Sequence, residues 1–223
     1  KGIIPTPDNM PDEVACQAFV NPFTAHAMLA EANLEAGQWL LITAGASAFG
    51  KFVIQLCKQR GVNTVCTVRH DEQVTLLKEL GATEVVNTEK ADLVKAVKTA
   101  TDGKGAAYCF DAVGGALGAE AINSLANNGT MLAFGLMSLD DTPVNTGIMI
   151  FKNLIIKGFW LTTWMMNQSK ESLYEVTKAV LTQLTTQELK ADIAATYSLD
   201  QIKEAVVHAE KPGKNGKVIL DLR

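Results

Sequence analysis

The residues most suited to chemistry form a run of small side chains at 43–51, TAGASAFGK, between an apolar segment of strand length and a segment with helical spacing. At such a junction, backbone N–H groups and the helix dipole can hold a phosphate group. Gly45, Ser47 and Gly50 have the spacing of a dinucleotide-binding fingerprint, with serine in place of the middle glycine. Serine is small enough for close phosphate approach and adds a hydroxyl donor. The run therefore indicates binding of a dinucleotide.

Other chemistries compete for the same residues. The two outer glycines and Lys51 have the spacing of a P-loop, and Asp111 ends an apolar strand that could supply the acidic Mg²⁺ ligand, but Phe52 stands where a P-loop has Ser or Thr. A nucleophile elbow would need a second glycine where the sequence has Phe49. The alternatives are a P-loop-like nucleotide-binding or phosphoryl-transfer protein, and a small-residue turn that only packs a helix against a sheet.

The second predicted strand, TVCTV at 64–68, bears on the choice of dinucleotide. A fold that binds NAD places Asp or Glu on the ribose 2′-hydroxyl about 20 residues after the first glycine. Here the strand is followed by Arg69 and His70, and the first carboxylate is Asp71. A planar guanidinium can hold the 2′-phosphate of NADP through paired hydrogen bonds. The sequence therefore predicts a preference for NADPH over NADH.

The segments that must position these residues alternate between strand and helix. We predict strands at 39–43, 64–68, 84–87, 108–113 and 130–134, with helices at 52–59, 71–80, 91–100 and 116–126. Such alternation is typical of repeated βαβ units, and near-continuously apolar strands are typical of a sheet buried on both faces. The predicted fold class is α/β, a doubly wound parallel sheet.

Further elements are expected on both sides of this unit. Residues 12–32 look helical, with an interruption at Pro22. After a polar loop at 138–146 we predict a strand at 153–160, a long amphipathic helix at 169–188, a strand at 193–198, a helix at 200–210 and a closing strand at 217–222. Ser198 and Gln201 have the spacing of a capping box.

Composition narrows the class of protein. Of the 223 residues, 48% are hydrophobic and 20% charged, which suits a large core and excludes a disordered chain. The net charge of −4 predicts no nucleic-acid partner and no anionic membrane partner, and no apolar run approaches the roughly 18 residues of a membrane span. The four cysteines form no CxxC pair, which predicts reduced thiols and a cytoplasmic location.

Taken together, the sequence resembles the medium-chain dehydrogenase/reductase superfamily, in its zinc-independent quinone oxidoreductase and 2-enoyl-thioester reductase branches. The resemblance is carried, in order along the chain, by 20–29 (VNPFTAHAML), 43–50 (TAGASAFG), 68–71 (VRHD), 134–137 (FGLM), 157–161 (KGFWL) and 216–221 (GKVILD). In that family a Rossmann cofactor domain is inserted between two parts of a GroES-like catalytic domain. The resemblance implies that this chain lacks the N-terminal GroES-like domain and keeps remnants of it at both ends.

The same resemblance divides the chain into five segments. They are the end of the catalytic-domain segment at 1–11, with its last strand at 3–7; a linking helical segment at 12–36; an NADP-binding Rossmann domain at 37–168; the long helix of that domain at 169–192; and the C-terminal return of the catalytic domain at 193–223.

The resemblance also implies the cofactor, NADP(H), and a set of cofactor-binding residues matched by motif. Asn21 would contact the nicotinamide end, and Ala46, Ser47, Ala48 and Phe49 the pyrophosphate. Arg69 and His70 would contact the adenosine phosphate, Phe134, Gly135, Leu136 and Met137 would line the nicotinamide half, Phe159, Trp160 and Leu161 would form its far wall, and Lys217 would close over the cofactor. No catalytic residue is named, because the proton-donating tyrosine of the enoyl reductases belongs to the N-terminal domain. Asn21 occupies the position of a cysteine ligand in the zinc-dependent branch, so no metal site is expected.

The implied function is NADPH-dependent reduction of a conjugated C=C bond, in an enoyl thioester or an enone, or of a quinone, by an enzyme that is incomplete as this chain. A non-catalytic NADPH-binding module is a further alternative. The expected partners are a small-molecule substrate and a second copy of the chain, joined through an edge strand at 153–160 as relatives join theirs. Tyr174 and Lys178 match the Y-x-x-x-K signature of short-chain dehydrogenases, but the lead-in before the first strand favours an ordinary amphipathic helix there.

Overall fold

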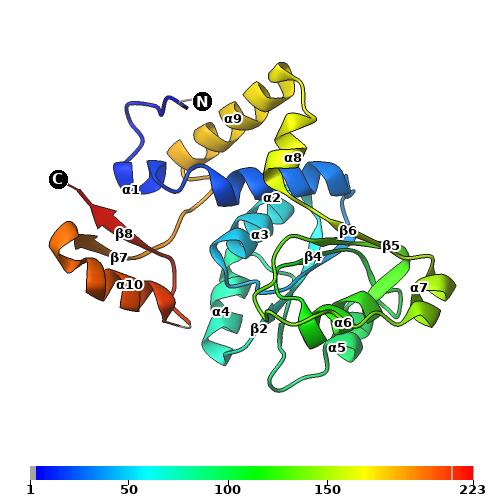
Figure 1. Ribbon diagram of the computed structural model, residues 1–223. Coiled ribbons are helices and arrows are strands. Elements are labelled where there is room, and N and C mark those ends of the chain that lie inside the picture. Colours follow the sequence, from blue (N-terminus) through cyan, green and yellow to red (C-terminus); the bar gives the residue numbers. More distant parts are fainter. Residues whose placement is uncertain (1–3, 212, 223) are drawn as a thin grey trace.

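The computed structural model describes residues 4–211 and 213–222, and its centre is a parallel sheet of six strands (Figure 1). The strands are β1 (Trp39–Ile42), β2 (Asn63–Val68), β3 (Glu84–Asn87), β4 (Ala106–Asp111), β5 (Leu125–Ala133) and β6 (Ile155–Gly158). They lie in the order β3-β2-β1-β4-β5-β6, and every neighbouring pair is parallel. The chain therefore winds outward in both directions from β1 and β4, which confirms the predicted doubly wound fold.

Helices cover both faces of this sheet. Helices α3 (Ala48–Arg60) and α4 (Asp71–Leu80) pack on one face, and α5 (Leu93–Ala100) and α6 (Gly115–Asn123) on the other. The central strand shows why its sequence is apolar throughout: Leu40 and Ile42 belong to the core under α3, whereas Leu41 belongs to the core under α5 and α6. Side chains alternate between the faces of a strand, so a sheet covered on both sides needs apolar residues at every position.

A further helical layer lies outside α3. Helix α2 (Val20–Ala32) contacts α3 on one side, and α8 (Leu161–Met166) and α9 (Lys170–Thr185) on the other (Figure 1). Most of its residues are buried, as expected for a helix that is apolar on all sides. The predicted interruption at Pro22 is wrong. Helix α1 (Asp12–Ala15) ends before α2 begins, and Pro22 lies in the first turn of α2, where a missing N–H costs no intrahelical bond.

The C-terminal segment forms a separate small unit beside the main sheet. Strands β7 (Ile193–Ser198) and β8 (Lys217–Asp221) pair in parallel and are joined through a short 3₁₀ turn, η1 (Leu199–Gln201), and helix α10 (Ile202–Glu210). The predicted capping box of Ser198 and Gln201 is present. Residues 4–7 form no strand, and position 3 lies outside the described residues. Pro5 and Pro7 have no N–H with which to pair with a neighbouring strand.

Several element boundaries also differ from the prediction. Helix α7 (Thr146–Lys152) was not expected; the Asn145 side chain caps it by accepting a hydrogen bond from the Ile148 N–H at 3.2 Å. Asn153 ends α7 with a left-handed φ of 52°, so the strand predicted from 153 begins only at β6. Residues 125–126, predicted to end a helix, begin β5 because Leu125 pairs with Ala106. Residue 161 begins α8, another helix that periodicity did not predict.

His26 is a polar residue inside the helical layer. It is 8% exposed, and its Nε2 lies 2.9 Å from Oε1 of Gln183 in α9. Burial lowers the pKa of His26 below the ordinary histidine value, the hydrogen bond with Gln183 opposes that shift, and the charge of Arg60 adds to it. The folded protein therefore favours the neutral imidazole.

This environment predicts a loss of stability in acid. The contribution of neutral His26 is complete above the ordinary histidine pKa of about 6.5 and is lost as the pH falls through that value towards the lower pKa of the folded state. We expect the midpoint of urea unfolding to fall between about pH 7.5 and about pH 5.5, and to fall less in His26→Gln, which keeps an amide to pair with Gln183. A pH profile of His26→Gln identical to that of the wild type would contradict this prediction.

Candidate functional site

A cavity of about 830 Å³ opens where β1, β2 and β4 end and α3 begins. This is the carboxyl edge of the sheet at the point where the strand order reverses, the usual ligand site of a doubly wound fold. The loop before α3, the end of β2, the loops that follow β3, β4 and β5, and the turn before β8 all contribute to its walls. The polar and charged residues among its lining are Ser47, Thr67, Arg69, Gln73, Thr88, Glu89, Glu120, Ser138, Glu210, Lys211, Lys214 and Lys217.

Two glycines allow the loop before α3 to pass this close to the sheet. A Cβ on Gly45 would lie 2.7 Å from the Cβ of Cys66 in β2, and a Cβ on Gly50 would overlap the carbonyl of Gly45. The Gly45 N–H donates to the Thr67 carbonyl at 2.8 Å. The loop is thus fixed to β2, and α3 begins directly above the strand ends.

The first turn of α3 presents N–H groups at the cavity. The Ser47 hydroxyl caps the helix by accepting from the Gly50 N–H at 3.0 Å. Helix geometry leaves the amides of Ala48 and Phe49 without an intrahelical acceptor, and the helix dipole adds partial positive charge at the same place. Ser47 and Ala48 line the cavity. Such an arrangement can bind an anion such as a phosphate group.

Asp111, the acidic residue of the P-loop interpretation, holds strand ends together. Its side chain is buried and accepts hydrogen bonds from the Thr43 hydroxyl at 2.7 Å, the Val113 N–H at 3.1 Å and the Gly114 N–H at 3.0 Å. The Thr43 hydroxyl in turn accepts from the Ala112 N–H at 2.9 Å. This network joins the end of β1 to the turn after β4, and it occupies both carboxylate oxygens.

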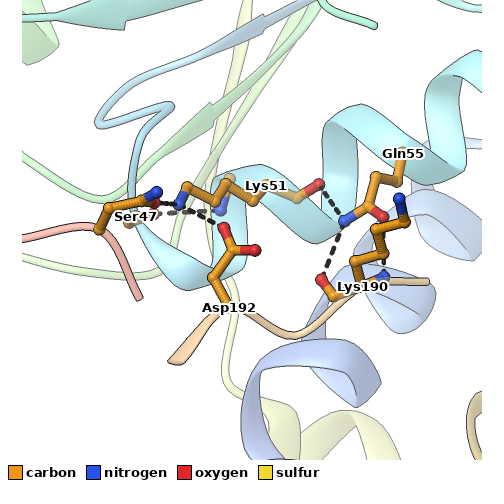
Figure 2. A network of polar contacts seen from close by, with 7 residues as sticks. Ser47, Lys51, Gln55, Lys190 and Asp192 are labelled. Carbon is orange, nitrogen blue, oxygen red and sulfur yellow. Dashed lines mark hydrogen bonds and ion pairs between the residues drawn. The ribbon is translucent and has the colours of Figure 1, made fainter. Parts of the chain in front are cut away.

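Lys51, the lysine of the same interpretation, is likewise engaged by the protein. Its ammonium forms an ion pair with Asp192 at 2.6 Å (Figure 2). It also forms a hydrogen bond with the Asn215 side chain. Lys51 is not among the residues that line the cavity. Since both residues that would serve phosphoryl transfer are engaged by the protein itself, the P-loop alternative is not favoured.

The charges on the cavity wall come from distant parts of the chain. Arg69 follows β2, whereas Lys211, Lys214 and Lys217 belong to the turn before β8, which is defined as Lys211 and residues 213–217 and so includes the first residue of that strand. Asp71, the first carboxylate after β2, does not line the cavity. It accepts from the Asn87 amide at 2.7 Å and pairs with Lys90.

The partners of Asp71 also affect the pKa of its carboxyl group. The hydrogen bonds from Lys90 and then from Asn87 lower the pKa of the Asp71 carboxyl. Burial opposes this shift weakly, and the charges of Lys90 and His70 add to it. Asp71 is thus a charged group held by the loop after β3. The acidic residue that would accept from a ribose 2′-hydroxyl is committed to other partners.

The residues expected to bind the cofactor fall into two groups. Those that line the cavity are Ala46, Ser47, Ala48, Arg69, Met137 and Lys217. Those that do not line it are Asn21, Phe49, His70, Phe134, Gly135, Leu136, Phe159, Trp160 and Leu161. The structure therefore brings four of the predicted phosphate-binding residues, Ala46, Ser47, Ala48 and Arg69, together around one cavity with Met137 and Lys217, but Phe49 and His70 do not line it.

Several residues of the second group lie close to the cavity but face the protein. Phe49 is 5% exposed and packs on Phe134 with ring centroids 4.3 Å apart, so only its backbone can meet a ligand. Gly135 lies against Ala112, whose carbonyl oxygen would be 2.7 Å from an added Cβ. The exposed His70 lies beside the turn before β8, near Gly213.

The remaining residues of that group lie on other elements. Asn21 is in the first turn of α2, Phe159 is in the core, Trp160 is the exposed residue that precedes α8, and Leu161 begins that helix. Leu136 is exposed after β5. Their assignment to the nicotinamide side stays a prediction. Tyr174 is exposed on α9 and is not part of the cavity wall.

Sequence reasoning missed part of the cavity wall. Lys211 and Lys214 were not proposed, nor were the carboxylates Glu89, Glu120 and Glu210. The one signal that could have identified the lysines is their spacing with Lys217 in KPGKNGK at 211–217. Nothing in the local pattern says that this turn folds back onto the first turn of α3.

Over residues 4–211 and 213–222, no group of three or more His, Cys, Asp or Glu side chains is placed to hold a metal ion. In the same part of the chain, every helix is too short or too polar to cross a bilayer.

Comparison with known proteins gives consistent matches. The model of a family described as zinc-binding dehydrogenase matches residues 48–181. The chain is 29% identical over 222 residues to the mitochondrial enoyl-[acyl-carrier-protein] reductase of Dictyostelium discoideum, covering 97% of this chain and 63% of that protein. It is 27% identical over 227 residues to the human enzyme of the same name, covering 100% of this chain and 61% of that protein. The chain thus spans less than two thirds of the length of these relatives.

The chain is also similar to solved structures of the same overall fold. A protein of Bacillus thuringiensis assigned as an NADPH:quinone reductase has a TM-score of 0.90 and 30% identity, covering 99% of this chain and 67% of that one. A protein of Mesorhizobium loti with the same assignment has a TM-score of 0.87 and 32% identity, covering 97% of this chain and 62% of that one.

Ala44, in the loop before α3, has a strained backbone conformation whose energetic cost can be measured by substitution. Ala44 has a φ of 50°, in the left-handed region that costs a side-chain-bearing residue about 1 kcal/mol. We expect Ala44→Gly to raise the free energy of unfolding by up to about 1 kcal/mol in urea titrations, because glycine adopts this backbone without strain. Ala46→Gly, in the same loop but without a positive φ, should lower it by about 0.5 kcal/mol. Destabilisation by Ala44→Gly equal to that by Ala46→Gly would contradict strain at Ala44.

Proposed function

The chain belongs to the zinc-binding dehydrogenase family and, within the medium-chain dehydrogenase/reductase superfamily, to its zinc-independent members, and from this premise we propose that it is the NADPH-binding part of a reductase. The observation that carries the proposal is the cavity itself. It combines the open first turn of α3 with Arg69 and the three lysines of the turn before β8, while Asp71 is held by other partners. Such a wall suits a dinucleotide with an additional phosphate group.

The residues of the cavity fit NADP(H). Ala46, Ser47 and Ala48 would hold the pyrophosphate through the first turn of α3, where small side chains leave the amides accessible. Arg69 would hold the 2′-phosphate, with His70 beside it and the lysines of the turn before β8 opposite. When bound, the nicotinamide supplies a hydride. Met137 lies on the wall formed by the loop after β5, which we assign to the nicotinamide half.

The reaction we propose is reduction of a C=C bond conjugated to a carbonyl, in an enoyl thioester or an enone, or of a quinone. The relatives support this range: two are named enoyl-[acyl-carrier-protein] reductases and two are assigned as NADPH:quinone reductases. The part played by this chain is to bind the cofactor and orient it. Asn21, Phe159, Trp160 and Leu161, which lie on the α2 and α8 side of the molecule, are proposed to border the nicotinamide and a small-molecule substrate. A non-catalytic module is not favoured, since these relatives are named as enzymes.

We also propose that two copies of the chain associate through β6. This strand is at the end of the main sheet and pairs only with β5 among the described strands, so one of its edges is open to a second copy. Ile155 on β6 is 56% exposed, and Phe151 on the adjacent α7 is 90% exposed. An apolar strand edge of this kind favours pairing with an identical strand.

The compartment is a further proposal. The four cysteines are free thiols, and three of them are buried. Burial raises the pKa of the Cys57 and Cys66 thiols to about 12, which keeps them protonated and unreactive. These thiols suit a reducing compartment. We propose the cytoplasm, as the sequence suggested, with the mitochondrion indicated by the names of the enoyl reductase relatives as the other location to test.

Calorimetric titration tests the cofactor assignment. We expect NADPH to bind about tenfold more tightly than NADH, a difference that matches one charge-assisted contact to the 2′-phosphate. Arg69→Ala should remove most of this preference and leave NADH binding nearly unchanged. Arg60→Ala is the matched control, because it removes an exposed arginine that does not line the cavity. Binding of Mg²⁺-ATP alone, or equal binding of NADPH and NADH by the wild type, would overturn the assignment.

Light scattering tests the association through β6. At micromolar concentration we expect the mass of two chains, and Ile155→Lys should shift the equilibrium towards one chain because a charge on an edge strand disfavours pairing. Val207→Lys on α10, at a residue 60% exposed and remote from β6, should leave the mass unchanged. A wild-type mass of one chain would refute this association.

A further inference from the structure

Lys51 is a charged residue that the proposed function does not use. It lies in the first turns of α3, its backbone N–H donates to the Ser47 carbonyl at 3.0 Å, and its side chain is 6% exposed. A cation near a helix N-terminus opposes the helix dipole, and a buried charge is costly unless it is paired. The free energy of this buried charge therefore depends on the groups that pair with it.

Those partners belong to the C-terminal unit. The Lys51 ammonium pairs with Asp192, just before β7 (Figure 2). It also bonds to the Asn215 side chain, just before β8. The Asp192 carbonyl accepts from the Lys217 N–H at 2.9 Å, and an added Cβ on Gly216 would lie 2.7 Å from that carbonyl. Asp192 and the turn before β8 are thus one assembly, and Lys51 holds both of its parts.

The same turn forms a wall of the cavity. Lys211, Lys214 and Lys217 line it, whereas Asn215 between them does not and instead bonds to Lys51. On the α3 side, Ser47 lines the cavity and the backbone of Lys51 is bonded to it. One side chain therefore connects the helix turn that faces the cavity to the lysine-bearing turn opposite.

We propose that Lys51 is a positioning residue for NADP(H): by holding Asp192 and Asn215 it fixes residues 213–217 against the first turn of α3, so that the lysines of the turn and the amides of the helix act on the same nucleotide. This inference rests on the proposed function. It gives Lys51 a role different from that of a P-loop lysine, since its ammonium acts through the protein rather than on a phosphate. Binding of the nucleotide and docking of the turn are then coupled, because each restricts the same segment.

The chain provides a matched control on the same face of α3. Gln55, one helical turn further from the cavity, donates to the Lys190 carbonyl at 3.2 Å and accepts from the Lys190 N–H at 2.8 Å (Figure 2). It attaches α3 to the segment before β7, and no bond joins it to residues 213–217. Its Nε2 also donates to the Lys51 carbonyl at 3.1 Å, a bond within α3 that leaves the Lys51 ammonium free to hold its own partners. A substitution of Gln55 therefore removes a neighbouring tertiary anchor and keeps the bonds of the Lys51 side chain.

The test measures amide hydrogen exchange of residues 213–217, with and without NADPH, together with the calorimetric Kd. In the wild type, NADPH should slow exchange in this turn. In Lys51→Met we expect the Kd to rise about tenfold, the size expected for loss of one charge-assisted contact, and exchange in the turn to be fast with or without NADPH. Gln55→Met should lower stability while keeping the wild-type Kd and the protection of the turn. Lys51→Arg, which keeps the charge, should recover part of the affinity.

Asn215→Ala keeps the test valid if Lys51→Met does not fold, because Asn215 is exposed and its loss leaves the ion pair intact. It should change the Kd and the exchange of the turn in the same direction as Lys51→Met. An unchanged Kd and unchanged exchange in the folded Lys51 or Asn215 variants would overturn the inference. Absence of NADPH binding in the wild type would instead refute the proposed function, and unchanged exchange of the nucleotide-free turn in these variants would then overturn the anchoring role as well.

Discussion

Helix α3 can begin above the strand ends only because Gly45 and Gly50 lie closer to their neighbours than any side chain would permit. The rest of the site depends on this close approach. It brings the first turn of the helix, with its free amides and dipole, to the carboxyl edge of the sheet, where the strand order reverses. The buried bonds of Thr43 with Asp111 and with the Ala112 N–H then join the end of β1 to the turn after β4, beside the cavity.

Helix α3 also determines where the C-terminal unit lies. One face of the helix is apolar and packs on the sheet, whereas Lys51, Gln55 and Gln59 recur at intervals of four residues on another face. These side chains bond to Asp192, to the backbone of Lys190 and to the backbone of Glu188. Buried polar groups require partners, and within the described part of the chain no buried side-chain polar atom lacks one. The polar side of α3 therefore acts as a specific docking site for the segment that leads to β7.

The distribution of charge around the cavity differs from that of the whole chain. The net charge is −4, yet the cavity wall carries Arg69 and three lysines against three glutamates, and the dipole of α3 adds to the positive side. A local excess of cations in an acidic protein attracts a phosphate-bearing ligand to one place without making the whole surface bind polyanions. This arrangement suits a nucleotide better than a nucleic acid. It also explains why the net charge of the whole chain argues against a nucleic-acid partner but leaves a nucleotide ligand open.

The sequence by itself determined the parallel α/β core and the glycine-rich loop between β1 and α3, because both are encoded in short segments. The period of apolar residues, the helix-ending glycines at 61 and 81, and the capping residues Ser47 and Ser198 act within a few residues of themselves. Only the tertiary structure decided that Lys51 and Asp111 serve the fold, that Asp71 is held by Asn87 and Lys90, and that Lys211 and residues 213–217 complete the cavity. Each of these facts depends on a contact between segments far apart in the chain, and the partner of a charged side chain is set by the packing of whole elements rather than by its neighbours in sequence.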